Sequence, residues 1–509
     1  MQQTILALDL GTGGIKAALY AAAAPCEKLA DAFCEYPTYT PAADFREQKP
    51  EDWWHGVRVT VKAALAKAGL SGEDVCAVGV SGHSLGIVPL DAAGKLCAET
   101  TPIWSDSRAG AEAERFFASV PENTWYMETG GGFACATYPI FKLMWLRAHD
   151  EALYQRAVRF IGTKDYINYR LTGQIATDPS YASGCGAYSL RKEAYCLPFM
   201  EAAGLKEGLF PDIAPSGAVM GRVTKDAAAK LGIREGAAVV CGGVDNALMA
   251  LGAGCFAEGE HYLSLGTSAW IAVSGRQPVL DAEKKPFVFQ HCVPGQFLSS
   301  TGIFSAGDTL RWVRDRMFGE LEKDAAYAEI NRLAALSPCG AHGLMMNPSL
   351  AGGSEIEPSP LIRGALMGLE ARHTRGDAAR AAMEGVAMSL RTARDVLAHS
   401  CELPPQMLIV GGGAKSPLWM QIFADVLGER VLTSRVGQDC AALGAAALCA
   451  QALGICSIRE VITHAHGEAR AYDPGENQPV YAAMQPAFER AAALIAQVSE
   501  LIRAEWKGE

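Results

Sequence analysis

The sequence lacks the short motifs that identify two common classes of nucleotide-binding protein. No Walker A string, G-x-x-x-x-G-K-[ST], occurs in its 509 residues. No expected strand is followed by a G-x-G-x-x-G turn with an acidic residue downstream, which is the signature of a dinucleotide-binding domain. If the protein binds a nucleotide, it must hold the phosphates in another way.

Disulfide and zinc-binding patterns are also missing. The fifteen cysteines are an odd number, include no C-x-x-C pair, and are not accompanied by histidine clusters at zinc-ligand spacing. We interpret them as buried free thiols in a reducing compartment. The N-terminal apolar run reaches Asp9 without the basic segment of a signal peptide, so we expect a cytoplasmic protein.

Positive charge and long apolar runs are scarce. The formal net charge is -11 and no run of Lys and Arg occurs, which disfavours nucleic acid and anionic membranes as partners. The longest stretch of small apolar residues, 441–456, consists mostly of Ala and Gly and contains Gln451. We expect it to form a buried helix and not a membrane span.

What the sequence does contain is an alternation of short apolar strands with longer helical patterns. A helical pattern over 57–68 precedes a strand-like run over 75–81, and this order favours an α/β fold. A later helix is expected to begin at Asp377, a residue type that is common at N-caps. The length leaves room for two large domains or three small ones.

An internal repeat supports two related domains. Residues 6–14 and residues 262–268 share one pattern, in which an apolar strand leads into Gly-Thr and small residues before a second strand. We therefore predict a first domain over residues 1–252 and a second over residues 253–509.

Each copy of the repeat predicts a hairpin whose exposed N–H groups can approach a phosphate closely. The turn residues are Gly11, Thr12 and Gly13 in the first copy and Gly266, Thr267 and Ser268 in the second. Asp9 lies before the first turn, where a carboxylate can hold Mg²⁺, and Lys16 follows it as a point charge for phosphate. One copy alone would be read as an ordinary hairpin, but two copies favour phosphate binding.

Two further glycine clusters each follow an apolar strand and precede a helix. In 242–246, Asp245 is either an N-cap or a general base that the Gly-Gly turn directs into a cleft. In 411–416, the backbone of Gly411, Gly412, Gly413 and Ala414 suits a base or ribose that lies across it, although a tight turn is the simpler interpretation.

A candidate sugar-binding segment lies in the first half. Trp104, Asp106 and Arg108 offer an aromatic face, a carboxylate and a guanidinium group, which match the apolar faces and hydroxyl rims of sugars. A buried Trp beside a surface ion pair is the alternative. His83 follows a strand and could reach a hydroxyl, or it could be structural.

Taken in order, seven segments resemble the FGGY family of carbohydrate kinases, and its xylulokinase branch in particular. The resemblance runs from about Thr4 to about Gln451. The segments are DLGTGGIK at 9–16, QKPEDWW at 48–54, KLMWL at 142–146, GGVDN at 242–246, SLGTS at 264–268, 364–384, and GGGAKS at 411–416.

The resemblance implies two actin-like (ribonuclease H-like) ATPase domains with a cleft between them, and phosphorylation of a small sugar by ATP with Mg²⁺. Asp245 would be the catalytic base and Asp9 a catalytic, Mg²⁺-associated carboxylate. The turn residues above, with Lys16 and 411–414, would bind ATP. The sugar site would consist of His83, Ser84, Trp104, Asp106, Arg108 and Asn246. A homodimer is compatible with the resemblance.

Two segments depart from the xylulokinase pattern. His83-Ser84-Leu85-Gly86 stands where that branch has Gln-Met-His-Gly, and Gly352-Gly353-Ser354 replaces Gly-Glu-Arg-x-Pro. We expect a ketopentose such as xylulose, with ribulose, gluconate, glycerol, erythritol or a similar polyol as alternatives. A non-metabolic actin-like ATPase and a Rossmann oxidoreductase are the rival classes, and the missing dinucleotide motif disfavours the second.

Overall fold

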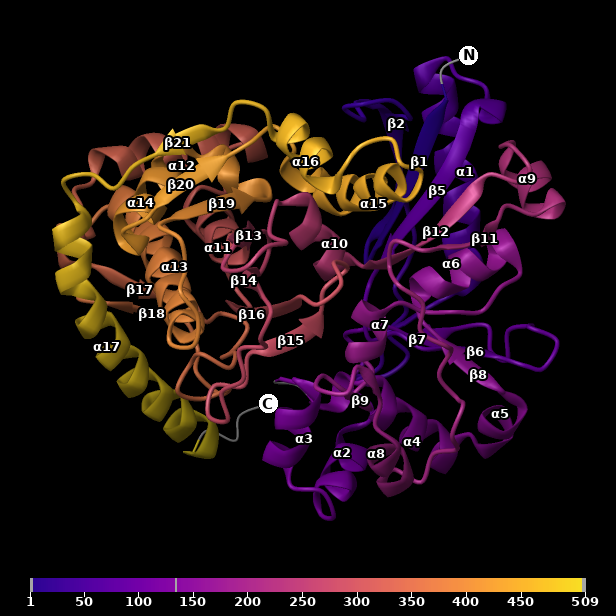
Figure 1. The fold of residues 1–509 in the computed structure, drawn as a ribbon. Helices are drawn as coiled ribbons and strands as arrows, with labels where there is room; N and C mark the ends of the chain where they lie inside the picture. The colour runs from indigo at the N-terminus through magenta and orange to yellow at the C-terminus, as the bar shows by residue number, and fades with distance from the viewer. Residues whose placement is uncertain (1–2, 133–134, 506–509) are drawn as a thin grey trace. The chain divides into compact units, whose positions relative to one another are not determined.

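The computed structural model describes residues 3–132 and 135–505, which form two compact units (Figure 1). Unit 1 comprises Met1–Glu258, Ser274–Leu298 and Asp439–Ala465. Unit 2 comprises Gly259–Val273, Ser299–Gln438 and His466–Glu509. Residues 439–465 therefore belong to unit 1, although most of unit 2 precedes them in the sequence. The internal repeat did not predict this return of the chain. The division at residue 253 stays a prediction.

Unit 1 is built on a mixed sheet with the strand order β11-β12-β5-β1-β2-β3. These strands are β1 (Thr4–Gly11), β2 (Gly14–Ala21), β3 (Lys28–Glu35), β5 (Val75–Gly82), β11 (Val219–Arg222) and β12 (Ala238–Val244). Neighbours β12, β5 and β1 are parallel to one another, whereas β2, β3 and β11 pair antiparallel. The carboxyl ends of three adjacent strands consequently meet at one edge of the sheet.

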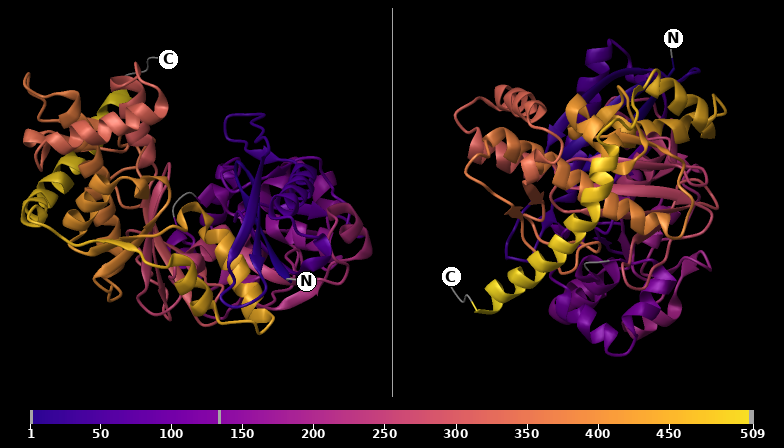
Figure 2. Two further views of the ribbon diagram at one scale, coloured as in Figure 1. Left: turned by 90° about the horizontal axis from the view of Figure 1, so that it is seen from above. Right: turned by 90° about the vertical axis from the view of Figure 1, so that its left-hand side faces the viewer.

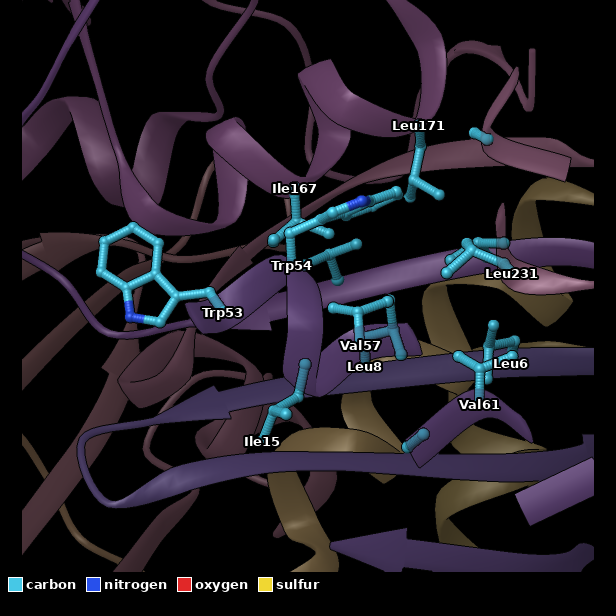
Figure 3. Packing of buried hydrophobic residues seen from close by; sticks show 14 of the residues in the cluster. Leu6, Leu8, Ile15, Trp53, Trp54, Val57, Val61, Ile167, Leu171 and Leu231 are labelled. Atoms are coloured by element: carbon cyan, nitrogen blue, oxygen red, sulfur yellow. The ribbon is translucent and has the colours of Figure 1, made fainter. Parts of the chain in front are cut away.

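One face of this sheet is covered by α1 (Pro50–Ala68). Figure 3 shows Trp53, Trp54 and Val57 of this helix beside the strand residues Leu8 and Ile15. All five are buried, with exposed fractions of 3% or less. Large apolar side chains on consecutive turns of one helix therefore close the core on this side.

The opposite face packs against α15 (Cys440–Ala452), which Figure 1 shows in gold. Alternate residues of a strand point to opposite faces, so Gly79 faces away from the side on which Val78 and Val80 contact the α1 core. A Cβ at Gly79 would approach Cys449 Sγ to 2.7 Å. Small residues thus permit close helix–sheet packing, and the expectation of a buried helix here is confirmed.

The rest of unit 1 consists of short strands and helices, several of which enclose a second, aromatic-rich core. The short strands are β4 (Glu47–Gln48), β6 (Val88–Leu90), β7 (Thr101–Pro102), β8 (Arg159–Ile161), β9 (Tyr188–Ser189), β10 (Ala194–Tyr195) and β15 (Phe287–Gln290). The helices are α2 (Gly110–Phe117), α3 (Glu122–Thr129), α4 (Pro139–His149), α5 (Glu151–Arg156), α6 (Thr163–Thr172), α7 (Pro179–Ser183), α8 (Leu197–Ala202), α9 (Lys225–Leu231), α10 (Asp245–Gly252) and α16 (Ile458–His466).

Unit 2 contains the second sheet, in which β16, β14, β13, β19, β20 and β21 follow one another. Its strands are β13 (His261–Leu265), β14 (Ala269–Gly275), β16 (Phe297–Ile303), β19 (Gln406–Val410), β20 (Arg430–Thr433) and β21 (Arg470–Tyr472), with a small pair β17 (Met345–Asn347) and β18 (Ala365–Met367). Hairpin β13/β14 matches hairpin β1/β2 in unit 1. The internal repeat therefore corresponds to two equivalent hairpins, as predicted.

The helices of unit 2 are α11 (Gly307–Met317), α12 (Lys323–Leu336), α13 (Arg375–Ala398), α14 (Pro417–Leu427) and α17 (Gln478–Glu505). Figure 2 shows α17 (yellow) as one long continuous helix. No helix in the described ranges is long and apolar enough to cross a membrane.

The start of α13 corrects one expectation from the sequence. Asp377 is not the N-cap, because Thr374 occupies that position and Asp377 is the third helical residue. The Thr374 side chain accepts from Asp377 N, and the Asp377 carboxylate accepts from Thr374 N at 2.8 Å. This reciprocal pair is a capping box, in which an acidic residue three positions inside the helix completes the cap.

Candidate active site

The candidate catalytic site of unit 1 lies where β1, β5 and β12 end. In the sheet register, Asp9 of β1 is opposite Ser81 of β5, and Ser81 is opposite Gly243 of β12. Ser81 Oγ donates a hydrogen bond of 2.9 Å to Asp9 Oδ1. Three neighbouring parallel strands therefore bring a carboxylate, a hydroxyl and the Gly-Gly turn into one row.

A bulge in β12 determines where Asp245 begins its helix. The pairing of β12 with β5 shifts register between Val240 and Gly243, and Gly242 between them has φ of 74°. A Cβ at Gly242 would lie 2.0 Å from Val80 O, so only glycine fits this position. The bulge turns the chain directly into α10, a common way to direct a side chain at a site.

The N-cap alternative for Asp245 does not describe the structure. Val244 occupies the N-cap position of α10, and Asp245 is the first helical residue. Asp245 Oδ1 accepts a hydrogen bond of 2.8 Å from Asn246 N, and both side chains are partly exposed. The carboxyl group is therefore held at the helix start, partly buried but in a residue that is not fully enclosed.

Burial raises the pKa values of both carboxyl groups, and the charge of Asp9 raises that of Asp245 further. The pKa of Asp245 is raised to about 7 by burial and then by the nearby charge of Asp9. Burial also raises the pKa of Asp9, although the hydrogen bond from Ser81 and the charge of Lys16 oppose this change. A carboxyl group with a pKa near neutrality can exchange a proton at physiological pH, which is what a general base requires.

Side chains from three segments hold the turn of the first hairpin. Tyr36 Oη donates to Gly11 O, and Gln48 Nε2 donates to Thr12 O at 2.7 Å. Gln48 is itself fixed, because its Oε1 accepts from Trp53 Nε1 at 2.9 Å. The carbonyl groups at the turn are therefore occupied by the protein, while Gly13 is exposed. This role accounts for Gln48 and Trp53 within the QKPEDWW segment.

Trp104 connects the candidate sugar segment to the same turn. Its indole Nε1 donates to Thr12 Oγ1 at 2.7 Å, and the side chain is 43% exposed. An exposed aromatic face beside this turn, a candidate for phosphate binding, can pack on the apolar face of a sugar. The indole is thus available to a ligand, contrary to the alternative of a buried Trp.

Lys16 already has a partner. It lies opposite Asp9 in the hairpin register, and its Nζ contacts Asp439 Oδ1 at 2.6 Å. Asp439 also contacts Lys28 Nζ at 2.6 Å. The charge of Lys16 still favours the ionised form of Asp9. Contact between Lys16 and a phosphate would require this ion pair to rearrange.

Asp106 and Arg108 form a buried pair, where the alternative reading had placed a surface pair. Arg108 Nε and Nη2 donate to the two Asp106 oxygens at 2.8 and 2.7 Å, and Nη2 also contacts Glu47 at 2.5 Å. The Asp106 side chain is fully buried and that of Arg108 is 5% exposed. The guanidinium group lies 3.7 Å from the ring centroid of Phe45. This bidentate pair fixes the loop that carries Trp104.

His83 is buried and 1% exposed, and neither ring nitrogen has a hydrogen-bond partner among the described residues. Its ring meets that of Trp53 edge-on at 5.6 Å. Burial, followed by the charge of Lys142, lowers the pKa of His83 to about 3, so the imidazole is neutral near pH 7. A neutral imidazole can donate from one nitrogen and accept at the other. Ser84 is also buried.

Unit 2 places the second hairpin turn beside the triple-glycine segment. β13 and β19 are parallel neighbours, with Ser264 opposite Val410, so the turns that follow them share one edge. Gly411 has φ of 100°, and a Cβ there would lie 2.5 Å from Leu265 O. Glycine therefore permits the close approach of the two segments.

The start of α11 supports this second turn. Gly307 N donates to Gly266 O at 2.9 Å and Ala306 N donates to Thr267 O at 2.9 Å. A Cβ at Gly307 would lie 2.4 Å from Gly266 O. As in unit 1, the carbonyl groups of the turn are occupied by the protein, and Gly266 and Thr267 are exposed.

Several residues that shape the site were not predicted from the sequence. Ser81 could have been inferred, because it ends the strand that we expected to follow the first helix. Asp439 carried no local signal, since its partner Lys16 lies 423 positions away. Within the described ranges, no group of three or more His, Cys, Asp and Glu residues could hold a metal ion.

Comparison with known proteins identifies the architecture. Residues 4–252 match the model of the N-terminal domain of the FGGY family of carbohydrate kinases, and residues 261–453 match its C-terminal domain. The predicted family and the two-domain α/β fold are therefore confirmed.

Individual relatives cover nearly the whole chain. The xylulose kinase of Staphylococcus xylosus is 28% identical over 446 residues, which is 88% of this chain and 90% of the relative. That of Escherichia coli (strain K12) is 29% identical over 450 residues, covering 87% and 89%. The crystal structure of xylulose kinase from Rhodospirillum rubrum has a TM-score of 0.88 at 27% identity and covers 98% of this chain and 100% of that one. This chain belongs to the FGGY family of carbohydrate kinases.

Proposed function

We propose that this enzyme transfers the γ-phosphoryl group of MgATP to a terminal hydroxyl of a ketopentose, with xylulose as the first candidate. ATP-dependent phosphorylation of a sugar is the activity of the family. The observation that carries the proposal is the position of Asp245, whose partly buried carboxyl group has a pKa of about 7 and lies at the same edge of the sheet as Asp9.

Asp245 is the proposed base. Its ionised carboxylate accepts the proton of the sugar hydroxyl while the hydroxyl oxygen forms a bond to the γ-phosphorus. The bond from that phosphorus to the bridging oxygen of ADP breaks, and ADP leaves with the electron pair. Such transfers depend mainly on positioning and charge neutralisation, and one carboxylate suffices as base.

Asp9 is the proposed carboxylate for Mg²⁺. Mg²⁺ is often held by one or two protein carboxylates together with waters and substrate phosphates, so a single accessible Asp fits this group. When bound, Mg²⁺ neutralises the charge that develops on the phosphates. The Ser81 hydrogen bond fixes the orientation of the Asp9 carboxylate and helps to keep it ionised.

The two Gly-Thr turns are the proposed phosphate sites. In both, neighbouring protein groups donate to the turn carbonyls, and this contact stabilises a turn whose remaining polar groups can face a ligand. Exposed glycines at the turns allow a phosphate to approach the backbone. We assign the nucleoside to 411–414, because a glycine segment beside the second turn leaves space for a flat base or ribose.

The proposed sugar site combines an accessible indole with buried polar groups. Trp104 supplies the apolar face, and the neutral imidazole of His83 supplies a donor and an acceptor that no residue in the described part of the chain satisfies. Asn246 lies beside the base, and Ser84 follows His83 in the segment that departs from the xylulokinase pattern. Asp106 and Arg108 are proposed to act by fixing the loop of Trp104.

The substrate is tested by ADP release in the presence of a panel of ketoses, polyols and sugar acids. We expect the highest kcat/KM with one ketopentose, because a site that pairs with particular hydroxyls rejects analogues that lack them. If only gluconate or glycerol stimulated ADP release, the protein would still be a kinase, but the ketopentose assignment would be wrong. A homodimer and a cytoplasmic location remain predictions, and sedimentation of the intact chain tests the first.

A further inference from the structure

A buried polar network lies next to β12, the strand that ends at the residue before Asp245. Its charged members are Lys164, Asp165 and Asp178, each at most 1% exposed. Lys164 Nζ contacts Asp165 at 2.5 Å and Asp178 at 3.0 Å. Buried charges are costly unless they are paired and hydrogen-bonded, so such a network is expected to fix the geometry of whatever it touches.

Ser180 connects this network to the backbone beside Asp245. Its Oγ accepts a hydrogen bond of 3.0 Å from Val244 N and donates one of 2.5 Å to Asp178 Oδ2. The same Asp178 oxygen accepts from Ser216 Oγ at 2.9 Å. Ser180 is fully buried. The N–H group of Val244, the residue before Asp245, therefore donates to the Ser180 hydroxyl, and the buried Asp178 carboxylate orients that hydroxyl.

The bulge explains why β12 needs these partners. Where its register with β5 shifts, the strand loses the regular ladder, and other groups satisfy its backbone. Gly242 N donates to Ser216 O at 2.9 Å, and Cys241 O accepts from Asn168 Nδ2 at 2.8 Å. Side chains and loops of unit 1 thus hold Cys241, Gly242 and Val244 around the bulge.

We propose that Ser180, oriented by Asp178, is a positioning residue that holds the β12–α10 junction so that Asp245 reaches the sugar hydroxyl. This inference rests on the proposed role of Asp245 as base. A base must lie within hydrogen-bond reach of the proton it accepts, and small displacements of a catalytic group lower the rate steeply. Ser180 does not need to touch either substrate, so its effect should be on turnover and not on binding.

The test is Ser180→Ala, with Ser183→Ala as the matched control. Ser183 lies in the same helix, is 2% exposed, and its Oγ accepts from a backbone amide, that of Gln290 at 2.9 Å. Both variants lose one buried hydroxyl–amide bond and one bond that the hydroxyl donates, to Asp178 Oδ2 from Ser180 and to Ser180 O from Ser183. Only Ser180→Ala frees the junction beside Asp245. We expect similar losses of melting temperature in the two.

The kinetic readout separates positioning from stability. We expect Ser180→Ala to lower kcat by about 10-fold to 100-fold, with KM for sugar and for ATP changed less than about twofold, whereas Ser183→Ala keeps its kcat within about twofold. Ser216→Ala removes one donor to Asp178 and leaves the bond between Ser180 and Val244. Its kcat should lie between those of Ser180→Ala and Ser183→Ala. This graded variant also provides a test if Ser180→Ala does not fold.

The outcomes distinguish this inference from the proposed function. Equal kcat losses in Ser180→Ala and Ser183→Ala, or a raised KM with unchanged kcat in Ser180→Ala, would overturn the positioning role. If Asp245→Asn is inactive and Ser180→Ala keeps the wild-type kcat, only the positioning role fails. If Asp245→Asn keeps its rate, the base assignment fails and the positioning role fails with it.

Discussion

Ser81 Oγ donates a hydrogen bond of 2.9 Å to Asp9 Oδ1 from the opposite position on the neighbouring parallel strand. This bond favours the ionised form of Asp9, and the resulting charge raises the pKa of Asp245. The two carboxyl groups therefore have different environments. Burial raises the pKa of both, but Asp9 has a hydrogen bond from Ser81 and the charge of Lys16 that oppose this change, whereas the charge of Asp9 raises the pKa of Asp245 further. This difference suits the roles proposed for them, a carboxylate for a cation and a base.

Asp245→Asn should leave ATP binding intact and remove most turnover. The substitution preserves size and deletes the base, and loss of a positioned base typically costs about 10²-fold to 10⁴-fold. Calorimetric titration with a non-hydrolysable ATP analogue measures binding, and steady-state kinetics measures turnover. A variant that phosphorylates sugar at nearly the wild-type rate would mean that Asp245 is not the base.

The kcat/KM for sugar should rise with pH and level off above a midpoint near pH 7. Asp245 must be ionised to accept the proton, and its pKa in the folded enzyme is about 7. Measurement at saturating MgATP from about pH 5 to about pH 9 gives this profile. The residual rate of Asp245→Asn should lack the same limb, and a wild-type profile flat across this range would contradict the assignment.

The same carboxyl group should affect stability. Its pKa is raised from 3.8 to about 7 by folding, so the folded protein retains the proton that the unfolded chain loses. The free energy of unfolding of the wild type, relative to that of Asp245→Asn, should therefore not change with pH below about pH 4. It should decrease as the pH rises from about 4 to about 7 and stay constant at higher pH. Urea unfolding of both proteins at several pH values checks the sign. A difference that increases with pH in favour of the wild type would show the opposite shift.

Asp9→Asn should weaken Mg²⁺-dependent catalysis. The amide can still accept from Ser81, but it carries no charge, so higher Mg²⁺ concentrations and a lower maximal rate are expected with any sugar. Ser81→Ala, which keeps the Asp9 charge, is the control and should have a smaller effect. An unchanged rate and Mg²⁺ requirement in Asp9→Asn would exclude the assignment.

Gln48→Ala should loosen the first phosphate turn. Gln48 is fully buried, and its loss leaves Thr12 O and Trp53 Nε1 without their partner. An unpaired buried group costs about 1–3 kcal/mol, and we expect a higher KM for ATP as well. The neighbouring Lys49→Ala removes a surface ion pair with Glu99 and a contact with the Tyr39 ring, so its effect on urea unfolding should be small.

The sequence predicts the local part of this site well. Gly-Thr repeats, strand ends and glycine clusters are short-range patterns, and they correctly located both hairpins and the helix that begins after Gly242-Gly243. The contact of Lys16 with Asp439 escaped prediction, because it joins residues far apart in the chain. The α13 start was misplaced by three residues because Asp377 serves the cap from inside the helix. Short-range patterns can therefore be predicted from a sequence, but contacts between residues far apart in the chain cannot.

The environment of the candidate sugar segment was also beyond sequence reasoning. Burial of Asp106 and Arg108 depends on Phe45 and Glu47, which precede them by about sixty positions and gave no sign of this contact. The contact of Trp104 with Thr12 likewise joins residues 92 positions apart, and the neighbours of Trp104 in sequence do not indicate it. Such properties arise only when the sheet brings separate segments together.

The most direct test of the central claim is ³¹P NMR of the products formed from ATP and xylulose. A kinase predicts a phosphate monoester whose phosphorus couples to the protons of one CH₂ group, in an amount equal to the ADP released, with Asp245→Asn forming neither. ADP accompanied only by inorganic phosphate, with xylulose and with every other sugar of the panel, would contradict sugar phosphorylation and identify the protein as an ATPase.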